Sequence, residues 1–130
     1  MRTDKQEKGA LGEDAVCAEL ERRGHRILAR NYHKRVGEID IISEIGDHIV
    51  FTEVKARKLG SMVSGLEAVD FAKKKKIIMT ADAYLTENPC GLFVRYDIAE
   101  VWLTIGTDPA VARVDIYEDA FDTEGVYTIN

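Results

Sequence analysis

Residues 37–57 read GEIDIISEIGDHIVFTEVKAR, and this stretch decides the fold. Apolar and polar side chains alternate over residues 36–43 and again over 48–56, which is the period-two pattern of β-strands. Gly46-Asp47 between them is an acceptable two-residue hairpin turn. The stretch therefore predicts an antiparallel β-hairpin.

This hairpin would place charged side chains opposite one another. With the turn at Gly46-Asp47, Asp40 faces Glu53 and Glu38 faces Lys55, and facing Cβ atoms lie about 4.5–5.5 Å apart. Aspartate is depleted in strands, so Asp40 between two isoleucines needs an explanation. Two facing carboxylates repel each other unless a cation lies between them, and a hard divalent ion such as Mg²⁺ or Mn²⁺ suits oxygen ligands. An exposed face of an edge hairpin is the alternative explanation for Asp40.

The residue types on the hairpin suit hydrolysis of a phosphodiester. Asp40 and Glu53 would hold the metal ion, which polarises the phosphodiester and lowers the pKa of a bound water. The ammonium group of Lys55 would orient that water or stabilise the charge that develops in the transition state. Glu38 would either pair with Lys55 or join the residues around the metal.

Two helical stretches contribute further candidates. In the helix predicted for residues 11–23, Glu13 lies on the apolar stripe, where an isolated carboxylate is expensive to bury. The alternative is that Glu13 is simply favoured by the helix dipole in the first turn. A second helix is predicted for residues 64–86, because residues 64–67 have the form of a capping box. Lys73 lies on the stripe of this helix that faces the sheet, whereas Lys74 to Lys76 point outward, and Lys73 would either extend to solvent or contact a phosphate.

The remaining stretches complete the predicted fold. Further strands are expected at residues 26–32, 92–103 and 112–117. The element order is then α-β-β-β-α-β-β, and an antiparallel hairpin joined to later strands by a helix predicts an α/β fold with a mixed β-sheet flanked by helices. A chain of 130 residues suits a single domain over residues 1–130, with flexible tails at 1–9 and 122–130.

Composition and charge limit the function further. No apolar run approaches the roughly 20 residues of a membrane span, and the start of the chain lacks the pattern of a secretory signal. Cys17 and Cys90 have no metal-binding spacing, so free thiols and a cytoplasmic location are expected. The net charge is −5, yet residues 1–80 carry 16 basic and 13 acidic side chains while residues 81–130 carry 2 and 10. Basic groups around an acidic centre suit a polyanionic substrate, although such runs are also ordinary helix and loop surface.

The ordered set of short motifs resembles the YraN-like family, a bacterial family of predicted endonucleases. The motifs are Gly12-Glu13-Asp14-Ala15, Arg30-Asn31-Tyr32, Gly37 to Ile42, Phe51 to Arg57, Lys73 and Arg95-Tyr96-Asp97. The resemblance runs from about Gly9 to Phe121. It implies the restriction-endonuclease-like fold of the PD-(D/E)xK superfamily, which is related to archaeal Holliday-junction resolvases. Ile39 departs from the pattern, since many superfamily members have proline there.

The resemblance also implies roles for individual residues. Asp40 matches the metal-binding acid of the superfamily, and Glu53 with Lys55 matches its E-x-K motif. Glu13 matches the acid of the first helix, so these four residues form the expected catalytic set, and the three acids are the expected ligands of Mg²⁺ or Mn²⁺. The residues expected to contact nucleic acid are Arg30, Arg57 and Lys73.

These observations support one leading hypothesis and two alternatives. The leading hypothesis is a metal-dependent nuclease that hydrolyses DNA phosphodiester bonds at branched or single-stranded structures. The second is a non-catalytic nucleic-acid-binding module of the same fold, which would show salt-sensitive binding without turnover. The third is an interaction domain that binds a protein partner through the acidic residues 81–130. A homodimer would suit a four-way junction.

Overall fold

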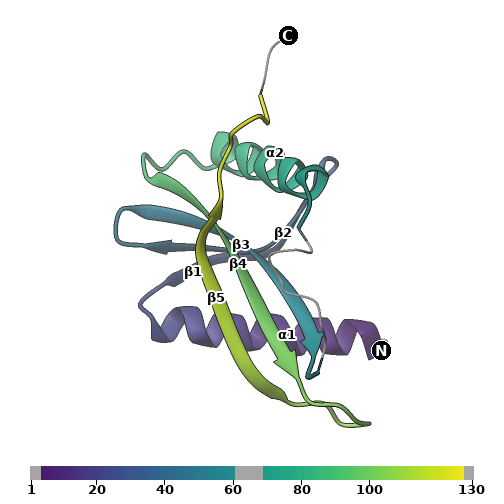
Figure 1. Ribbon diagram of the computed structural model, residues 1–130. Coiled ribbons are helices and arrows are strands. Elements are labelled where there is room, and N and C mark those ends of the chain that lie inside the picture. Colours follow the sequence, from purple (N-terminus) through teal and green to yellow (C-terminus); the bar gives the residue numbers. More distant parts are fainter. Residues whose placement is uncertain (1–3, 61–68, 128–130) are drawn as a thin grey trace.

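A computed structural model describes residues 4–60 and 69–127 of the chain. Within these residues lie a five-stranded β-sheet and two α-helices, in the order that the sequence predicted (Figure 1). The elements are α1 (Asp4–Arg22), β1 (Arg26–Lys34), β2 (Gly37–Ile45), β3 (His48–Lys58), α2 (Phe71–Glu87), β4 (Phe93–Leu103) and β5 (Val111–Phe121). The strands lie in the sheet in chain order, with β3 and β4 parallel and the other neighbours antiparallel. The predicted α/β fold with a mixed sheet is confirmed.

The sheet separates two apolar layers. Ile41 and Ile42 point to opposite faces of β2, as neighbours on a strand do. Ile42 packs in one layer with Ile77 of α2, whereas Ile41 packs in the other with Val16 and Leu20 of α1. Burying each such side chain contributes about 1.5–3 kcal/mol to stability. Each helix therefore covers one face (Figure 1), and α2 supplies the crossover that the parallel pair of strands requires.

The β2–β3 hairpin has the predicted register over most of its length. Ile45 pairs with His48 across the turn, and the pairing continues to Ile41 and Thr52. Gly46 in the turn has a φ of 58°, a left-handed conformation that glycine adopts without strain. The ladder ends one residue short of the predicted facing pair of acids. The hairpin is therefore open where the candidate site lies.

The strict alternation predicted for β2 fails around Asp40. Ile39 belongs to the same apolar layer as Ile42, although residues three apart on a regular strand point to opposite faces. The neighbouring strand is irregular at the same level, since Asn31 of β1 has a left-handed φ of 50°. The alternation predicted over residues 36–43 would place Glu38, Asp40 and Ile42 on one face. This expectation is wrong, because the strand changes its orientation at Asp40.

The second helix begins later than predicted. α2 starts at Phe71, and the side chain of Asp70, its N-cap, accepts a hydrogen bond of 2.9 Å from the main-chain N–H of Lys73. Residues 69–70 are not helical. The predicted capping box at residues 64–67 lies outside the described residues. Aspartate, rather than serine, is thus the cap of the helix that the structure describes.

Parts of both stretches that were expected to be tails contain secondary structure. Residues 4–9 form the first turns of α1, although the sequence there is polar and mixed in charge. Beyond β5, residues 123–127 form a bend and a turn, and Val126 is buried in the layer under α2. The apolar side chain of Val126 gains from leaving water, which fixes this segment against the core. Residues 1–3 and 128–130 lie outside the described part of the chain.

Two predictions from composition can be compared with the structure. Cys17 is buried and Cys90 is exposed, and both are free thiols, as predicted. Neither helix in the described ranges is long and apolar enough to cross a membrane.

Close packing brings α2 against the start of β2. A Cβ atom added at Gly37 would lie 3.0 Å from Oγ1 of Thr80 and 3.4 Å from Cβ of Lys76. A larger residue at this position would push the helix away from the strand. Gly37 therefore lets the lysine-rich helix lie close to the strand that carries Asp40.

Candidate metal and catalytic site

Asp40 lies where β2 and β3 separate. Its Oδ2 atom accepts a hydrogen bond of 2.7 Å from the main-chain N–H of Val54. The carboxylate thereby takes the place that a main-chain carbonyl of β2 would occupy in a continuous ladder. Asp40 and Glu53 also share a side-chain hydrogen bond. The two acids therefore meet through their side chains in a widened hairpin, rather than as a regular cross-strand pair.

Negative charge is crowded at this position. Burial and, after it, the charge of Glu53 raise the pKa of Asp40 to about 7, and Glu13 adds a further repulsion, while the hydrogen bond from Val54 acts in the opposite direction. Glu53 itself is only 6% exposed. With its pKa raised to about 7, Asp40 keeps its proton towards neutral pH unless a cation comes to lie beside it.

Glu13 reaches the same region from α1. Its Oε1 atom is buried without a hydrogen-bond partner, and Nη2 of Arg30 lies 3.6 Å from it. Burial raises the pKa of Glu13, whereas the charge of Arg30 and a hydrogen bond with Asn31 lower it. Glu13 also acts electrostatically on Asp40, so its charge reaches the pair formed by Asp40 and Glu53 from a separate element.

Two lysines face these acids. Nζ of Lys55 lies 3.4 Å from Oε1 of Glu53, and Nζ of Lys73 lies 3.6 Å from the same oxygen. Lys55 follows Glu53 on β3, and Lys73 comes from the first turn of α2. Of the remaining lysines in the run, Lys74 does not point outward as predicted, because its Nζ lies 5.8 Å from the centre of the Phe121 ring. Only part of the lysine run is therefore directed at the site.

The donor set fits a hard divalent cation. Within residues 4–60 and 69–127, no group of three or more His, Cys, Asp or Glu side chains lies close enough together to hold a metal ion. The three acids nevertheless offer only oxygen atoms, one of which, on Glu13, is buried and lacks a hydrogen bond. In the structure as it stands, Arg30, Lys55 and Lys73 balance the charge of these acids.

An open depression of about 900 Å³ adjoins Glu13, and its volume is in the range of ligand-binding clefts. Its lining residues are Gln6, Gly9, Ala10, Glu13, Asp14, Arg30 and Asn31. Arg30 donates a hydrogen bond of 2.8 Å to Oδ1 of Asp14. Arg30 thus lines the depression together with Glu13 and Asp14, and its exposed guanidinium can exchange an internal carboxylate for an external anion.

Glu38 lies apart from the lysine that was expected to face it. Its Oε2 atom lies 3.2 Å from Nδ1 of His33 on β1, and the ladder between β2 and β3 does not extend to it. The side chain is half exposed. The register that placed Glu38 opposite Lys55 therefore does not hold beyond Asp40, because the hairpin opens there.

Glu100 is a buried acid that was missed in the sequence. It lies beside Lys55 in the parallel register of β3 and β4 and is 1% exposed. Its Oε1 atom accepts a hydrogen bond of 3.1 Å from the hydroxyl of Tyr117, and its Oε2 atom lies 3.6 Å from Nε of Arg57. The sequence did contain a sign of it, since Glu100 is an acidic residue within an otherwise apolar strand, as Asp40 is. Arg57, an expected nucleic-acid contact, thus has an internal carboxylate beside it.

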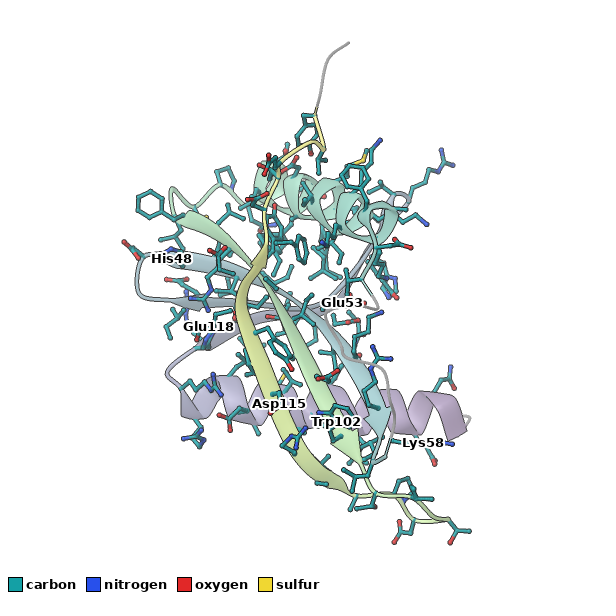
Figure 2. All side chains as sticks on the ribbon, viewed as in Figure 1. His48, Glu53, Lys58, Trp102, Asp115 and Glu118 are labelled. Carbon is teal, nitrogen blue, oxygen red and sulfur yellow. The ribbon has the colours of Figure 1, made fainter. Side chains whose placement is uncertain are left out.

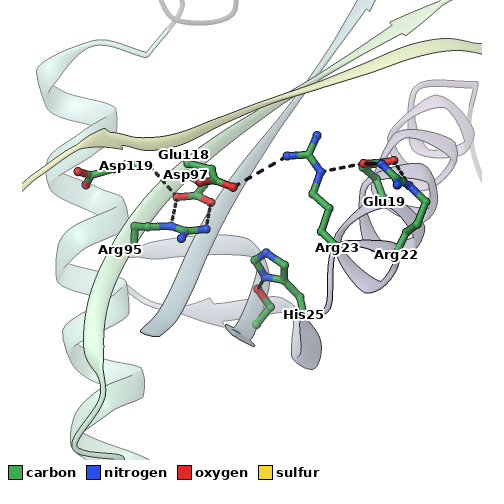
Figure 3. A network of polar contacts seen from close by, with 9 residues as sticks. Glu19, Arg22, Arg23, His25, Arg95, Asp97, Glu118 and Asp119 are labelled. Atoms are coloured by element: carbon green, nitrogen blue, oxygen red, sulfur yellow. Dashed lines mark hydrogen bonds and ion pairs between the residues drawn. The ribbon is translucent and has the colours of Figure 1, made fainter. Parts of the chain in front are cut away.

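A separate polar network lies nearer the hairpin turn (Figure 3). Arg95 donates two hydrogen bonds of 2.9 Å to Asp97, which also accepts one of 3.0 Å from the main-chain N–H of Asp119. His25 is buried with Nδ1 2.8 Å from Oγ of Ser43, and burial lowers the pKa of its imidazole. Because Asp97 is fully buried and its charge is met by Arg95, the network ties β5 to β4.

The fold and the comparison with known sequences define the class of this protein. Five strands in this order, with α2 crossing between the parallel pair, are consistent with a restriction-endonuclease-like core. The chain belongs to the uncharacterised protein family UPF0102, which matches residues 12–101. The match begins just before Glu13 and ends within β4. The resemblance to the YraN-like family is therefore confirmed at the level of the family.

Relatives in other bacteria match most of the chain. A UPF0102 protein of Desulforapulum autotrophicum is 40% identical over 127 residues, which cover 95% of this chain and 100% of the relative. A UPF0102 protein of Pseudomonas aeruginosa is 32% identical over 127 residues, covering 93% and 97%. One of Clostridioides difficile is 41% identical over 98 residues, covering 75% and 86%. These proteins are therefore similar to this chain over most of their own length.

Proposed function

We propose that this protein is a metal-dependent nuclease that hydrolyses phosphodiester bonds in DNA. One observation supports the proposal: the largely buried carboxyl groups of Asp40 and Glu53 lie at an opened hairpin, with two lysines beside Glu53 and with the charge of Glu13 of α1 acting on Asp40. Burying carboxylates close together destabilises a fold, and such arrangements are found preferentially at functional sites. The expected location in the cytoplasm suits a nucleic-acid substrate.

The three acids have a common role in this proposal. Glu13, Asp40 and Glu53 would hold Mg²⁺ or Mn²⁺ through their carboxylate oxygens. The ion, when bound, polarises the phosphodiester and makes a bound water more acidic. Its positive charge would relieve the repulsion between Asp40 and Glu53 and satisfy the buried oxygen of Glu13.

The cations have two different roles. The ammonium group of Lys55 would stabilise the negative charge that grows on the phosphate oxygens as the bond breaks. Arg30, Arg57 and Lys73 would hold the phosphate backbone, which brings the scissile bond to the acids. Arg30 and Lys73 are already beside the acids, so a phosphate can take over the contacts they now make with Glu13 and Glu53.

A cleavage assay on a panel of DNA substrates tests this proposal. Single-stranded, flapped, duplex and four-way-junction oligonucleotides are incubated with the purified protein and Mg²⁺ or Mn²⁺. We expect cleavage of at least one substrate, and a chelator should abolish it. The Asp40→Ala protein, purified in the same way, must be inactive, whereas Asp47→Ala should remain active because Asp47 lies on the exposed hairpin turn.

Two other results would overturn the proposal. If neither metal supports cleavage of any substrate, the protein is not a nuclease of this type. If the protein binds DNA in a salt-sensitive manner, does not cut it, and keeps this binding in the Glu53→Ala variant, the non-catalytic binding module is the correct description.

A further inference from the structure

The sheet face that α2 covers continues beyond the helix. Under α2 this face of β4 is apolar, with Tyr96 and Ile98 in the core. The next two residues on the same face are Glu100 and Trp102. Figure 2 shows Trp102 and Asp115 on the part of β4 and β5 that lies far from α2, with Glu53 between them and the helix. The candidate site therefore borders a polar stretch of the same sheet face.

Trp102 is held in a defined orientation on this stretch. Its Nε1–H donates a hydrogen bond of 3.0 Å to Oδ2 of Asp115, and Nε of Arg113 donates one of 2.9 Å to the same oxygen. Cζ of Arg113 lies 5.1 Å from the centre of the indole ring. Trp102 pairs directly with Arg113 across β4 and β5, and Asp115 lies two residues further along β5, opposite Glu100. One carboxylate thus holds a flat aromatic ring and a flat guanidinium group together.

This arrangement lies close to the candidate site. In the parallel register Trp102 is level with Arg57, two residues beyond the level of Lys55. From the strand rise and the strand spacing, the Cα atoms of Lys55 and Trp102 are about 8 Å apart. A nucleic-acid strand with its scissile phosphate at the acids would therefore cover Trp102 within a few nucleotides.

We propose that Trp102 and Arg113 form a stacking platform for the unpaired bases of a single-stranded nucleic acid. This inference rests on the proposed function, because it names the substrate class of the same site. Aromatic rings and guanidinium planes stack on bases of any sequence, and neighbouring cations follow the phosphate backbone. Lys55 and the largely exposed Arg113 supply those cations. A duplex hides the faces of its bases, so the platform selects an unpaired segment.

The internal acids of this stretch do not oppose the binding of an anion. Asp115 is engaged by Trp102 and Arg113, and Glu100 by Tyr117 and Arg57. Each acid is therefore neutralised by a cation on its own face. What this face offers to a ligand is the indole ring, the guanidinium plane and the ammonium group of Lys55.

Fluorescence provides a direct test, because Trp102 is the only tryptophan of the chain. The full-length protein is titrated in chelator, so that no cleavage occurs, with an oligothymidylate of about ten nucleotides, a length within the usual site size of single-strand binders. We expect saturable quenching of the tryptophan emission. A duplex of equal length should quench less. Quenching by the duplex that equals that by the single strand would overturn the proposal.

Variants separate stacking from a structural role of the Trp102–Arg113 pair. Binding is measured by the anisotropy of a labelled oligothymidylate, and folding by thermal unfolding. Trp102→Leu should weaken binding about tenfold, whereas Trp102→Phe should retain most of it. Phe93→Leu is the matched control, because Phe93 is an exposed aromatic residue at the other end of β4. If a folded Trp102→Leu protein binds as tightly as wild type, the platform does not exist.

The outcomes also distinguish this inference from the proposed function. If the protein cuts DNA but binds it independently of Trp102, the nuclease proposal stands and the platform proposal is wrong. If the protein binds single strands through Trp102 but cuts no substrate, the platform proposal stands and the nuclease proposal is wrong.

Discussion

Replacing Lys55 by alanine is expected to lower the rate of metal-dependent cleavage by about 100-fold or more, the usual effect of removing a group that stabilises transition-state charge. Nζ of Lys55 lies 3.4 Å from Glu53, at the edge of the three acids. Because lysine offers no oxygen ligand, Lys55→Ala should still bind Mn²⁺. The measurement is the single-turnover rate at saturating metal, together with the affinity for Mn²⁺.

Lys73→Ala is the matched comparison for Lys55→Ala. Nζ of Lys73 lies 3.6 Å from the same oxygen of Glu53, so both lysines meet one carboxylate. Lys73 sits on α2 and is expected to act in substrate binding, so its loss should affect the affinity for DNA more than the rate at saturation. Lys75→Ala, which alters an exposed residue of α2, should match wild type. Equal maximal rates for Lys55→Ala and wild type would contradict the role given to Lys55.

Replacing Asp40 by asparagine is expected to stabilise the metal-free protein in mildly alkaline solution. The pKa of Asp40 is raised from an ordinary value of 3.8 to about 7 in the folded protein. The folded state therefore binds the extra proton more tightly than the unfolded chain, and the associated stability is present below pH 3.8 and lost as the pH rises through about 7. Asparagine keeps an acceptor for the N–H of Val54 but carries no charge, so it removes this pH-dependent loss.

The size of this effect follows from the linkage between pKa and stability. At about 1.4 kcal/mol per pKa unit, and with allowance for coupling to Glu53, Asp40→Asn should gain on the order of 3 kcal/mol at about pH 8 and almost nothing at about pH 4. Thermal unfolding in chelator should show a rise in Tm on the order of 10 °C at the higher pH. A rise that is equal at both pH values, or a fall at the higher one, would contradict the crowding of charge around Asp40.

Local sequence patterns were sufficient to predict most of the fold. Period-two alternation located the strands, and the turn at Gly46-Asp47 fixed the register from Ile41 to Ile45. The period-two pattern failed where long-range contacts determine the conformation of the backbone. The carboxylate of Asp40 accepts a hydrogen bond from the main-chain N–H of Val54 where the ladder ends. This hydrogen bond cannot be predicted from the local sequence pattern. The start of α2 at Phe71 likewise depends on its N-cap, Asp70. This cap was missed, because the capping box at residues 64–67 predicted an earlier start of the helix.

The residues of the candidate site also divide into those that local sequence patterns predicted and those that they did not. Asp40, Glu53 and Lys55 are close in sequence, so strand geometry alone suggested their proximity. Glu13 belongs to a separate helix, and only the family resemblance indicated its place beside them. Glu100 remained hidden because a single acid in a strand is ambiguous until its neighbours across the sheet are known.

The central claim is that Glu13, Asp40 and Glu53 bind a divalent metal ion. Isothermal titration calorimetry with Mn²⁺ at about pH 8, where the raised pKa leaves Asp40 largely ionised, tests it without any assumed substrate. We predict saturable binding to the wild-type protein and to the Asp47→Asn control, and loss of that binding in Asp40→Asn. Absence of saturable binding to wild type, or equal binding to wild type and Asp40→Asn, would contradict the claim.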